Sequence, residues 1–128
     1  MATTNTQYAD LLGVGQITRQ TVLNATATKN IRGGACRAYG MMIDNSANAS
    51  VVYVKLYDAL NPTVGTTDPD FVFKIAASAK VPILLNPRDD EDNGIAFTVA
   101  LTAACVTAGG TAGTSSPGSS VPVDFFTN

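Results

Sequence analysis

The chain has no histidine and no tryptophan among its 128 residues, and only two cysteines. Histidine is the commonest general base and the commonest metal ligand in proteins. Its absence excludes Ser-His-Asp and Cys-His catalysis, and two cysteines without imidazole are too few for a zinc site. Most of the aspartates stand in turn-like segments, where Asp bonds to nearby backbone N–H groups. We therefore expect a protein that is not an enzyme and that uses no cofactor.

Charged residues are scarce as well. They make up 14% of the chain, whereas an ordinary soluble domain has about 25%. The eight Lys and Arg residues are scattered and the net charge is −2, so no basic patch is available to neutralise phosphates. We expect no nucleic-acid partner. A surface rich in Thr, Asn, Ser and Gly instead suggests contact with other protein, since charge is depleted at the centres of interfaces.

Long apolar runs are also missing. None approaches the roughly 20 residues that span a bilayer, and the opening residues MATTNTQ have neither a cationic region nor an apolar run. We expect no membrane partner, no secretory signal, and synthesis in the cytoplasm. In that compartment Cys36 and Cys105 are predicted to be free buried thiols, although a disulfide between them stays open.

Short alternating runs separated by turn signals dominate what is present. The clearest is at residues 50–58, where Val52, Val54 and Leu56 fall on one face, with Tyr53, Lys55 and Tyr57 on the other. Similar runs occur at 20–26, 36–44, 71–75, 81–85, 94–102 and 121–125. The pattern predicts an all-β fold, a single antiparallel β-sandwich of jelly-roll or Ig-like type with about seven to eight strands.

Several local features follow from the same pattern. Residues 36–44 and 50–58 flank a short Asn- and Ser-rich turn, which predicts an antiparallel hairpin. Pro82 and Pro122 lack a backbone donor, so both strands that contain them are expected at sheet edges. Residues 94–102 are expected to form one strand, with Val99 on its inward face. Residues 109–120 are expected to form a flexible loop.

The N-terminal segment reads differently from the rest. Residues 1–18 are polar, with isolated apolar residues and two glycines, which predicts an extended arm in front of a sandwich domain over residues 19–128. Apolar side chains on an arm need a partner surface, on this subunit or on a neighbour. The candidate partner-binding residues are Tyr8, Leu11, Leu12, Ile17 and Arg19.

The acidic run at residues 88–94 is a weak candidate for a calcium site. Asp89, Glu91 and Asn93 followed by Gly94 resemble the start of a helical calcium loop, but Ala100 stands where that loop needs its twelfth-position Glu. A looser calcium site using Asp89, Glu91 and Asp92 stays open. The alternatives are a solvated acidic turn between strands and an acidic patch that meets an arginine of a partner.

Residues 52–69, VYVKLYDALNPTVGTTDP, resemble small virion proteins of tailed bacteriophages, in which a VYVKLYD-type strand precedes a PTVGT-type loop ending near Asp-Pro. Residues 94–101, GIAFTVAL, followed by a Thr/Ala/Gly-rich loop, extend the resemblance over about residues 36–108. It implies a β-sandwich that decorates or cements a capsid from the virion surface, often as a homotrimer. The implied partners are the major capsid protein and further copies of the chain.

Two alternatives remain beside this hypothesis. One is another virion part, such as a tail, neck or fibre-associated component. The other is a carbohydrate- or calcium-dependent binding module. Tyr39, Tyr53 and Tyr57 would form one sugar-stacking or partner-binding face. For these tyrosines, cross-strand packing is the competing interpretation.

Overall fold

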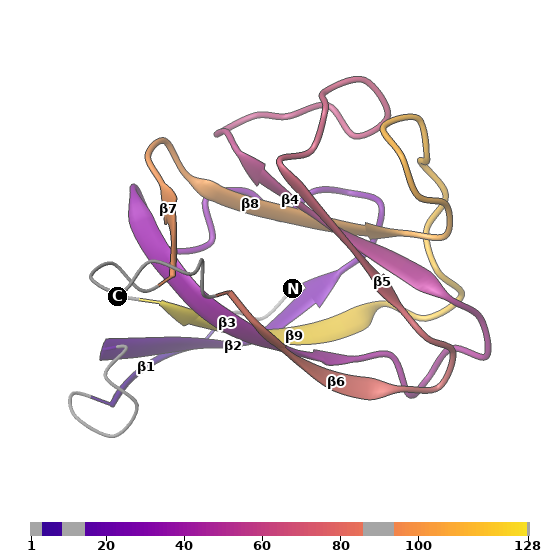
Figure 1. Ribbon diagram of the computed structural model, residues 1–128, viewed down its shortest axis with the longest axis horizontal. Coiled ribbons are helices and arrows are strands. Elements are labelled where there is room, and N and C mark those ends of the chain that lie inside the picture. The colour runs from indigo at the N-terminus through magenta and orange to yellow at the C-terminus, as the bar shows by residue number, and fades with distance from the viewer. Residues whose placement is uncertain (1–3, 9–14, 86–93, 128) are drawn as a thin grey trace.

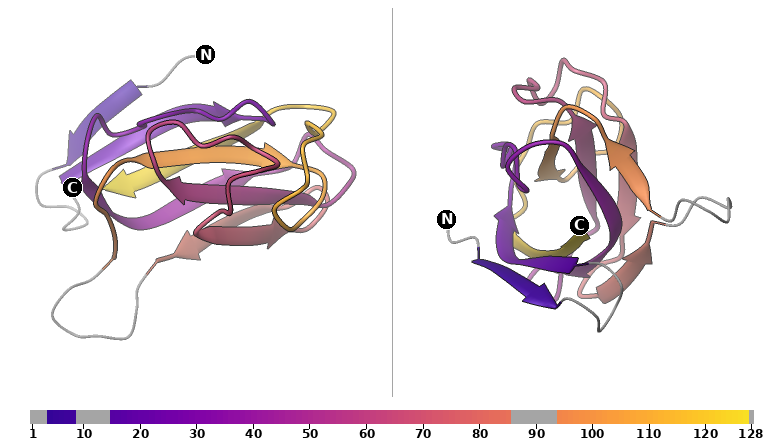
Figure 2. Two further views of the ribbon diagram at one scale, coloured as in Figure 1. Left: turned by 90° about the horizontal axis from the view of Figure 1, so that it is seen from above. Right: turned by 90° about the vertical axis from the view of Figure 1, so that its left-hand side faces the viewer.

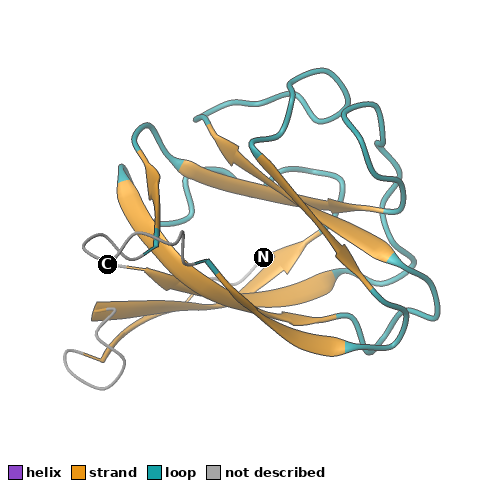
Figure 3. Ribbon diagram, in the orientation of Figure 1, coloured by secondary structure: helices purple, strands orange, loops and turns teal. Residues whose placement is uncertain are grey.

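The computed structural model describes residues 4–8, 15–85 and 94–127, with side chains from residue 21 onward. These residues form strands and turns but no helix (Figure 3), and none of them belongs to a helix that could cross a bilayer. The strands are β1 (Thr4–Tyr8), β2 (Gly15–Leu23), β3 (Cys36–Asp44), β4 (Val52–Asp58), β5 (Phe71–Ile75), β6 (Lys80–Leu84), β7 (Ile95–Phe97), β8 (Leu101–Val106) and β9 (Val121–Thr127).

The strands pack as two antiparallel sheets, one above the other (Figures 1 and 2). The large sheet has the order β1-β2-β9-β3-β6, with β7 also paired to β3, and the small sheet has the order β5-β4-β8. The predicted all-β sandwich is therefore confirmed. The described part of the chain has nine strands, because residues 4–8 add β1 and residues 94–102 contribute to two strands.

Strand order identifies the sandwich as a jelly roll. Residues 24–31 run along the free edge of β8, where Thr28 and Ala103 exchange backbone hydrogen bonds of 2.8 and 3.0 Å. Four segments, 24–31, β8, β4 and β5, thus face β2, β9, β3 and β6. The chain crosses from one layer to the other at nearly every connection, and its last strand lies inside the large sheet. This double Greek-key order is that of a jelly roll.

The core lies between the two sheets and follows the predicted alternation. Its buried members are Leu23, Ile31, Ala38, Met41, Ile43, Val52, Val54, Leu56, Ile75, Leu85, Phe97, Leu101, Ala103, Cys105, Val121, Val123 and Phe125. Half-buried Phe71 and Phe73 pack against this cluster from β5, and the ring of Phe71 meets that of Phe97 edge-on at 6.3 Å. Burial of apolar area on both inner faces holds the layers together.

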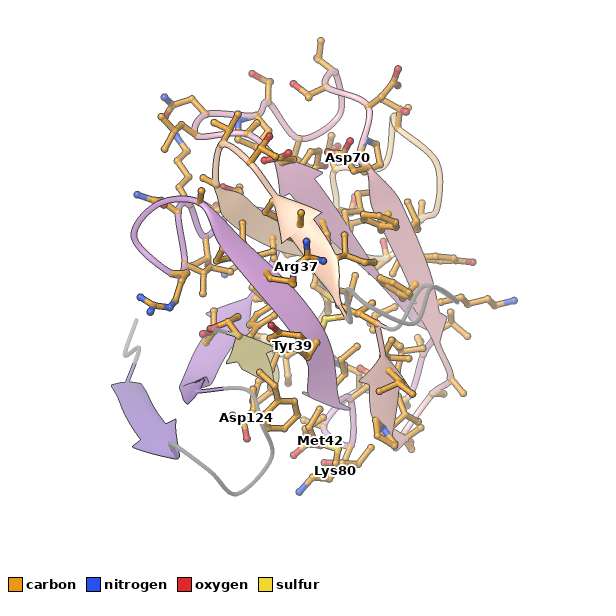
Figure 4. All side chains as sticks on the ribbon, turned by 60° about the vertical axis from the view of Figure 1, so that its left-hand side comes forward. Arg37, Tyr39, Met42, Asp70, Lys80 and Asp124 are labelled. Carbon is orange, nitrogen blue, oxygen red and sulfur yellow. The ribbon has the colours of Figure 1, made fainter. Side chains whose placement is uncertain are left out.

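The outer faces of the two sheets differ. On the large sheet, half-buried Met42 lies opposite Pro82 on β6 and Asp124 on β9, and Lys80 is exposed nearby (Figure 4). On the small sheet, Lys55 and Tyr57 are buried although they lie on the side of β4 away from the core, and the loop that carries Thr111 and Gly113 covers Lys55. Along β4 and β8, the small sheet is therefore buried on both faces.

The predicted hairpin of residues 36–44 and 50–58 is wrong. Both strands form, but β3 pairs with β6, β7 and β9, while β4 pairs with β5 and β8. Residues 45–51 carry the chain over the end of the core from one sheet to the other. Buried Asn45 and Asn48 make this possible, because their side chains bond to backbone groups within this segment and in two neighbouring loops.

The two proline predictions have opposite outcomes. β6, with Pro82, is an edge strand as expected, but β9, with Pro122, lies between β2 and β3. Pro122 is the second residue of β9 and stands opposite Val22, whereas the register with β3 reaches only Val123. An interior strand tolerates a proline at its start, where one of its two ladders has not begun.

Residues 94–102 do not form the single strand that was predicted. β7 pairs with β3 in the large sheet, and β8, from Leu101, pairs with β4 in the small sheet. The crossover leaves Val99 50% exposed, while Phe97 and Leu101 reach the core from the two layers. Apolar alternation continues through the crossover, so it does not reveal where the chain changes sheets.

Candidate functional site

Three loops meet at one end of the sandwich, on the right in Figures 1 and 3. They are residues 45–51 between β3 and β4, residues 76–79 between β5 and β6, and residues 107–120 between β8 and β9. We call this surface the loop end. The hydrogen bonds of its side chains determine whether these loops are held in one defined arrangement.

Two buried asparagines join the three loops. The Asn45 side-chain amide donates to the carbonyls of Ser50 and Ala76 at 3.1 and 2.9 Å. Asn48 donates to Asn45 Oδ1 and to the carbonyl of Ser119, both at 2.9 Å, and accepts from the Ser119 N–H at 2.8 Å. Each amide therefore replaces backbone partners that the irregular loops lack, which fixes the loops relative to one another.

A shallow pocket of about 380 Å³ opens between the first and third of these loops. It is lined by Ala47, Asn48, Ala49, Ser50, Val52, Thr107, Pro117, Gly118 and Ser119. None of the lining side chains is charged or aromatic. Such a lining offers small apolar groups, hydroxyls and backbone, which suits close contact with another protein backbone better than recognition of a charged ligand.

Lys55 fastens residues 107–116 over the outer face of the small sheet. Its side chain is 0% exposed, and its Nζ donates to the carbonyls of Gly113 and Thr111 at 3.1 and 3.4 Å. Burial lowers the pKa of Lys55 from its usual value. A buried ammonium is costly unless it is hydrogen-bonded, so these two carbonyls hold the loop in a defined place.

Further contacts fit the same loop to its surroundings. The Thr111 hydroxyl donates to Asp68 Oδ1 at 2.6 Å. Gly109 lies against the ring of Tyr53, so closely that a Cβ there would stand 3.0 Å from the ring. Gly113 packs more closely still, because a Cβ there would collide with the carbonyl oxygen of Ala108. Residues 109–120 are a loop, as expected, and two of its glycines, Gly109 and Gly113, are closely packed, whereas a Cβ at Gly110 would meet nothing within 4 Å.

Asp58 organises the opposite end of β4. One carboxylate oxygen accepts from the N–H groups of Val99 and Ala100 at 2.8 and 3.2 Å, and the other accepts from the N–H and hydroxyl of Thr98, both at 3.1 Å. Burial alone would raise the pKa of Asp58, but these donors outweigh it and lower the pKa. The carboxylate thus holds the crossover between β7 and β8.

The two cysteines are free. Cys105 is buried in β8, and Cys36 is half-buried in β3. Burial raises the pKa of Cys105 to about 12, and burial also raises that of Cys36. Neither thiol has the lowered pKa that marks a nucleophilic cysteine. Both thiols are free, as predicted; Cys105 belongs to the buried core, as expected, whereas Cys36 is only half-buried and packs against that core.

The candidate partner-binding residues fall on and around the first two strands. Tyr8 pairs with Gly15, Ile17 with Thr6, and Arg19 with Thr4, in the β1–β2 hairpin. Leu11 and Leu12 lie outside the described residues. The boundary drawn after residue 18 falls within β2, which continues across it and pairs with β9 on both sides. The role of these five residues in partner binding stays a prediction.

The calcium candidates Asp89, Glu91 and Asp92 also lie outside the described residues, and that hypothesis stays a prediction. Elsewhere, the described segments hold no group of three or more His, Cys, Asp or Glu side chains that could bind a metal ion.

The proposed tyrosine face is wrong. Tyr39 lies on β3 in the large sheet, whereas Tyr53 and Tyr57 lie on β4 in the small sheet. Tyr57 is buried, and its hydroxyl has no hydrogen-bond partner. The three rings therefore do not share one surface. Tyr53 packs against Gly109 in the loop after β8, and cross-strand packing of the tyrosines stays a prediction.

Sequence reasoning missed the structural roles of Lys55, Asp58, Asn45 and Asn48. One signal was available: Lys55 stands between two tyrosines on the less apolar side of the strongest strand. Apart from Ser50 and the Asn45–Asn48 pair, the partners of these residues lie 31 to 71 positions away in the sequence, so no local pattern could reveal those contacts. Comparison of the chain with protein-family models, curated proteins and solved structures gives no match.

Proposed function

We propose that this chain is a structural virion protein that binds the outer surface of a bacteriophage capsid and cements it by bridging major capsid protein subunits. The observation that carries the proposal is the loop end, where long, nearly uncharged loops are held in place by buried polar side chains. Asn45, Asn48 and Lys55 are all consumed by bonds to loop backbone. Loops that are already held in place lose little conformational entropy when a partner docks, so such a surface favours binding through a large contact area.

The sequence resemblance supports the same proposal through specific residues. The VYVKLYD stretch is β4, the central strand of the small sheet, and it supplies both Lys55 and Asp58. The PTVGT–Asp-Pro stretch follows, and its Asp68 accepts the hydrogen bond from Thr111. The residues that carry the resemblance are thus those that shape the loops. A jelly roll also occurs in viral coat proteins, but it serves other functions too, so fold adds little alone.

Capsid reconstitution tests the proposal. Purified protein is mixed with shells assembled from the major capsid protein of the virion that carries this chain, and the particles are imaged. Many copies at regular positions over the shell, with a raised temperature of shell disruption, are expected. Absence of binding at micromolar concentrations would contradict a cement function. Density confined to one vertex would instead favour the tail, neck or fibre alternative.

Two matched arginine substitutions identify the docking surface. Ala49 is exposed at the pocket of the loop end, and Ala96 is exposed on β7 at the other end of the sandwich. Ala49→Arg is expected to weaken shell binding at least tenfold, because it places an unpaired charge in an uncharged interface. Ala96→Arg should bind as the native chain does. Equal binding by both variants would exclude the loop end as the docking surface.

The arm is tested by removing residues 1–14, which deletes β1 and leaves β2 whole. Shorter deletions are preferable to removal of residues 1–18, because the latter cuts into a strand that pairs with β9. The truncated chain should fold and bind shells more weakly. Undiminished binding would show that Tyr8, Leu11 and Leu12 do not contact the shell. The homotrimer that the resemblance implies is also a proposal, and sedimentation measures it.

A further inference from the structure

The edges of the two sheets are protected unequally. An edge strand exposes unpaired backbone N–H and C=O groups, and native proteins blunt such edges with Lys, Pro, short strands or covering segments. The described part of the chain has three edges that carry one of these devices and one that carries none. The unprotected edge is β1, which pairs with β2 and with no other described strand.

On the small sheet, both edges are protected. β5 is the edge strand on one side, and exposed Lys74 stands near its end. On the other side, residues 24–31 cover β8, with Thr28 bonded to Ala103 and the Cys105 N–H bonded to the Asn24 carbonyl. An added strand would have to displace this segment or bury a lysine.

On the large sheet, one edge is protected in the same way. β6 carries exposed Lys80 and Pro82, and β7 beside it has only three residues. Pro82 removes a donor from the edge, and the short β7 offers few groups for pairing.

The remaining edge, β1, has the sequence Thr4-Asn5-Thr6-Gln7-Tyr8. It contains no proline and no charge, and Thr and Tyr favour strands. A strand of this kind is a template for β-strand addition.

We propose that β1 pairs with β1 of a second copy, antiparallel about a two-fold axis at Thr6, to form one continuous sheet across a homodimer. The strand is self-complementary in this register: Thr6 stands opposite Thr6, Asn5 opposite Gln7, and Thr4 opposite Tyr8. No like charges meet, and Thr–Thr and amide pairs are favourable cross-strand neighbours. A two-fold contact uses the same patch on both copies, so it leaves β1 of neither copy as an open edge.

This inference does not rest on the proposed capsid function. It also differs from the homotrimer that the resemblance implies, because three copies cannot pair around one two-fold axis. Oligomeric state therefore separates the two ideas directly.

The experiment uses the full chain and measures mass by sedimentation equilibrium over a range of concentrations. A reversible dimer is expected. A species that stays monomeric at hundreds of micromolar, or a trimer, would overturn the proposal.

Charge substitutions test the register. In Asn5→Lys/Gln7→Lys, each lysine stands opposite a lysine of the other copy, whereas in Asn5→Lys/Gln7→Glu each lysine stands opposite a glutamate. We expect the dimer dissociation constant of the Lys/Lys variant to be roughly tenfold higher than that of the Lys/Glu variant. At low concentration, where the chain is monomeric, each variant should melt at the same temperature as the native chain, which confirms that it is folded.

The same pair of variants distinguishes strand addition from exchange of β1 between copies. In an exchanged dimer, positions 5 and 7 would face Thr18 and Gln16, so the lysine and the glutamate would never meet. Equal dimerisation of the two variants would therefore overturn the proposal even if a dimer forms. Thr6→Lys, which puts like charges at the axis, should weaken the dimer, and Val72→Lys on the β5 edge should leave it unchanged.

Discussion

Lys55→Met is the most informative single change in this protein. Met keeps most of the apolar stem but removes the ammonium, so the carbonyls of Thr111 and Gly113 lose their donor. Hydrogen bonds from a charged donor contribute about 1.5–3 kcal/mol each. Part of this loss in stability is offset, because the desolvation cost of the buried ammonium also disappears. The acceptors are backbone carbonyls and cannot be replaced, so we expect a net loss of about 1–2 kcal/mol.

Thermal unfolding and hydrogen exchange measure this effect. A loss of that size corresponds to roughly 4–8 °C in melting temperature for a chain of this length. Amide exchange should accelerate in residues 107–116 far more than in β4 itself, because the loop loses its fastening while the strand keeps its ladder. The control is Lys74→Met on exposed β5, where the same substitution should change stability by less than about 0.5 kcal/mol.

The pH dependence gives a second readout of Lys55. Burial lowers its pKa in the folded state below the unfolded value near 10.5. The folded state therefore binds this proton more weakly than the unfolded state does. The desolvation cost of the buried ammonium is removed when Lys55 loses the proton, so the native chain gains stability as pH rises toward 10.5. The difference in unfolding free energy between the native chain and Lys55→Met should grow over that range. Equal stability of the two lysine variants, with unchanged exchange in residues 107–116, would refute the role assigned to Lys55.

Three further predictions follow from the other polar and thiol groups. Asp58→Ala should lower the free energy of unfolding by about 2–3 kcal/mol, because three backbone N–H groups lose a charged acceptor. Since the pKa of Asp58 is lowered in the folded state, the stability that its carboxylate contributes is present above pH 3.8 and is lost as pH falls through the lowered pKa. Acid unfolding of the native chain and the variant measures this loss. Asn48→Ala should cost about 2 kcal/mol in urea unfolding and speed exchange at Ser119, whose N–H loses its acceptor; unchanged exchange there would contradict the link between loops. A thiol reagent at pH 8 should label half-buried Cys36 before buried Cys105, which should react only on unfolding; equal rates would be inconsistent with the burial of β8.

Much of the fold could be predicted from alternation alone. Residues 36–44 form β3 with the predicted bounds, and Phe71, Phe73 and Ile75 reach the core from one side of β5 as expected. Such patterns are local, because successive side chains of a strand point to opposite faces. Pairing between strands is not local. The β3–β4 turn looks like a hairpin turn in sequence, but it joins two sheets.

The candidate site shows the same division. Scarcity of charge and the Gly- and Thr-rich composition of residues 109–120 are legible in the sequence, and they suggested a surface for protein contact. The sequence could not show that Lys55 would be buried, since its partners are carbonyls 56 and 58 residues away. Nor could it show that Asp58 would hold a crossover 40 residues further on.

By itself, then, the sequence excluded chemistry that needs an imidazole, and it determined the strand-forming segments and the inward face of most of them. These depend on residue identity and on the two-residue period of a strand. Only the tertiary structure decided which sheet each strand joins, which edge is left without protection, and which polar groups are spent in fixing loops. These depend on long-range packing, in which a backbone group takes whichever partner the fold brings within reach.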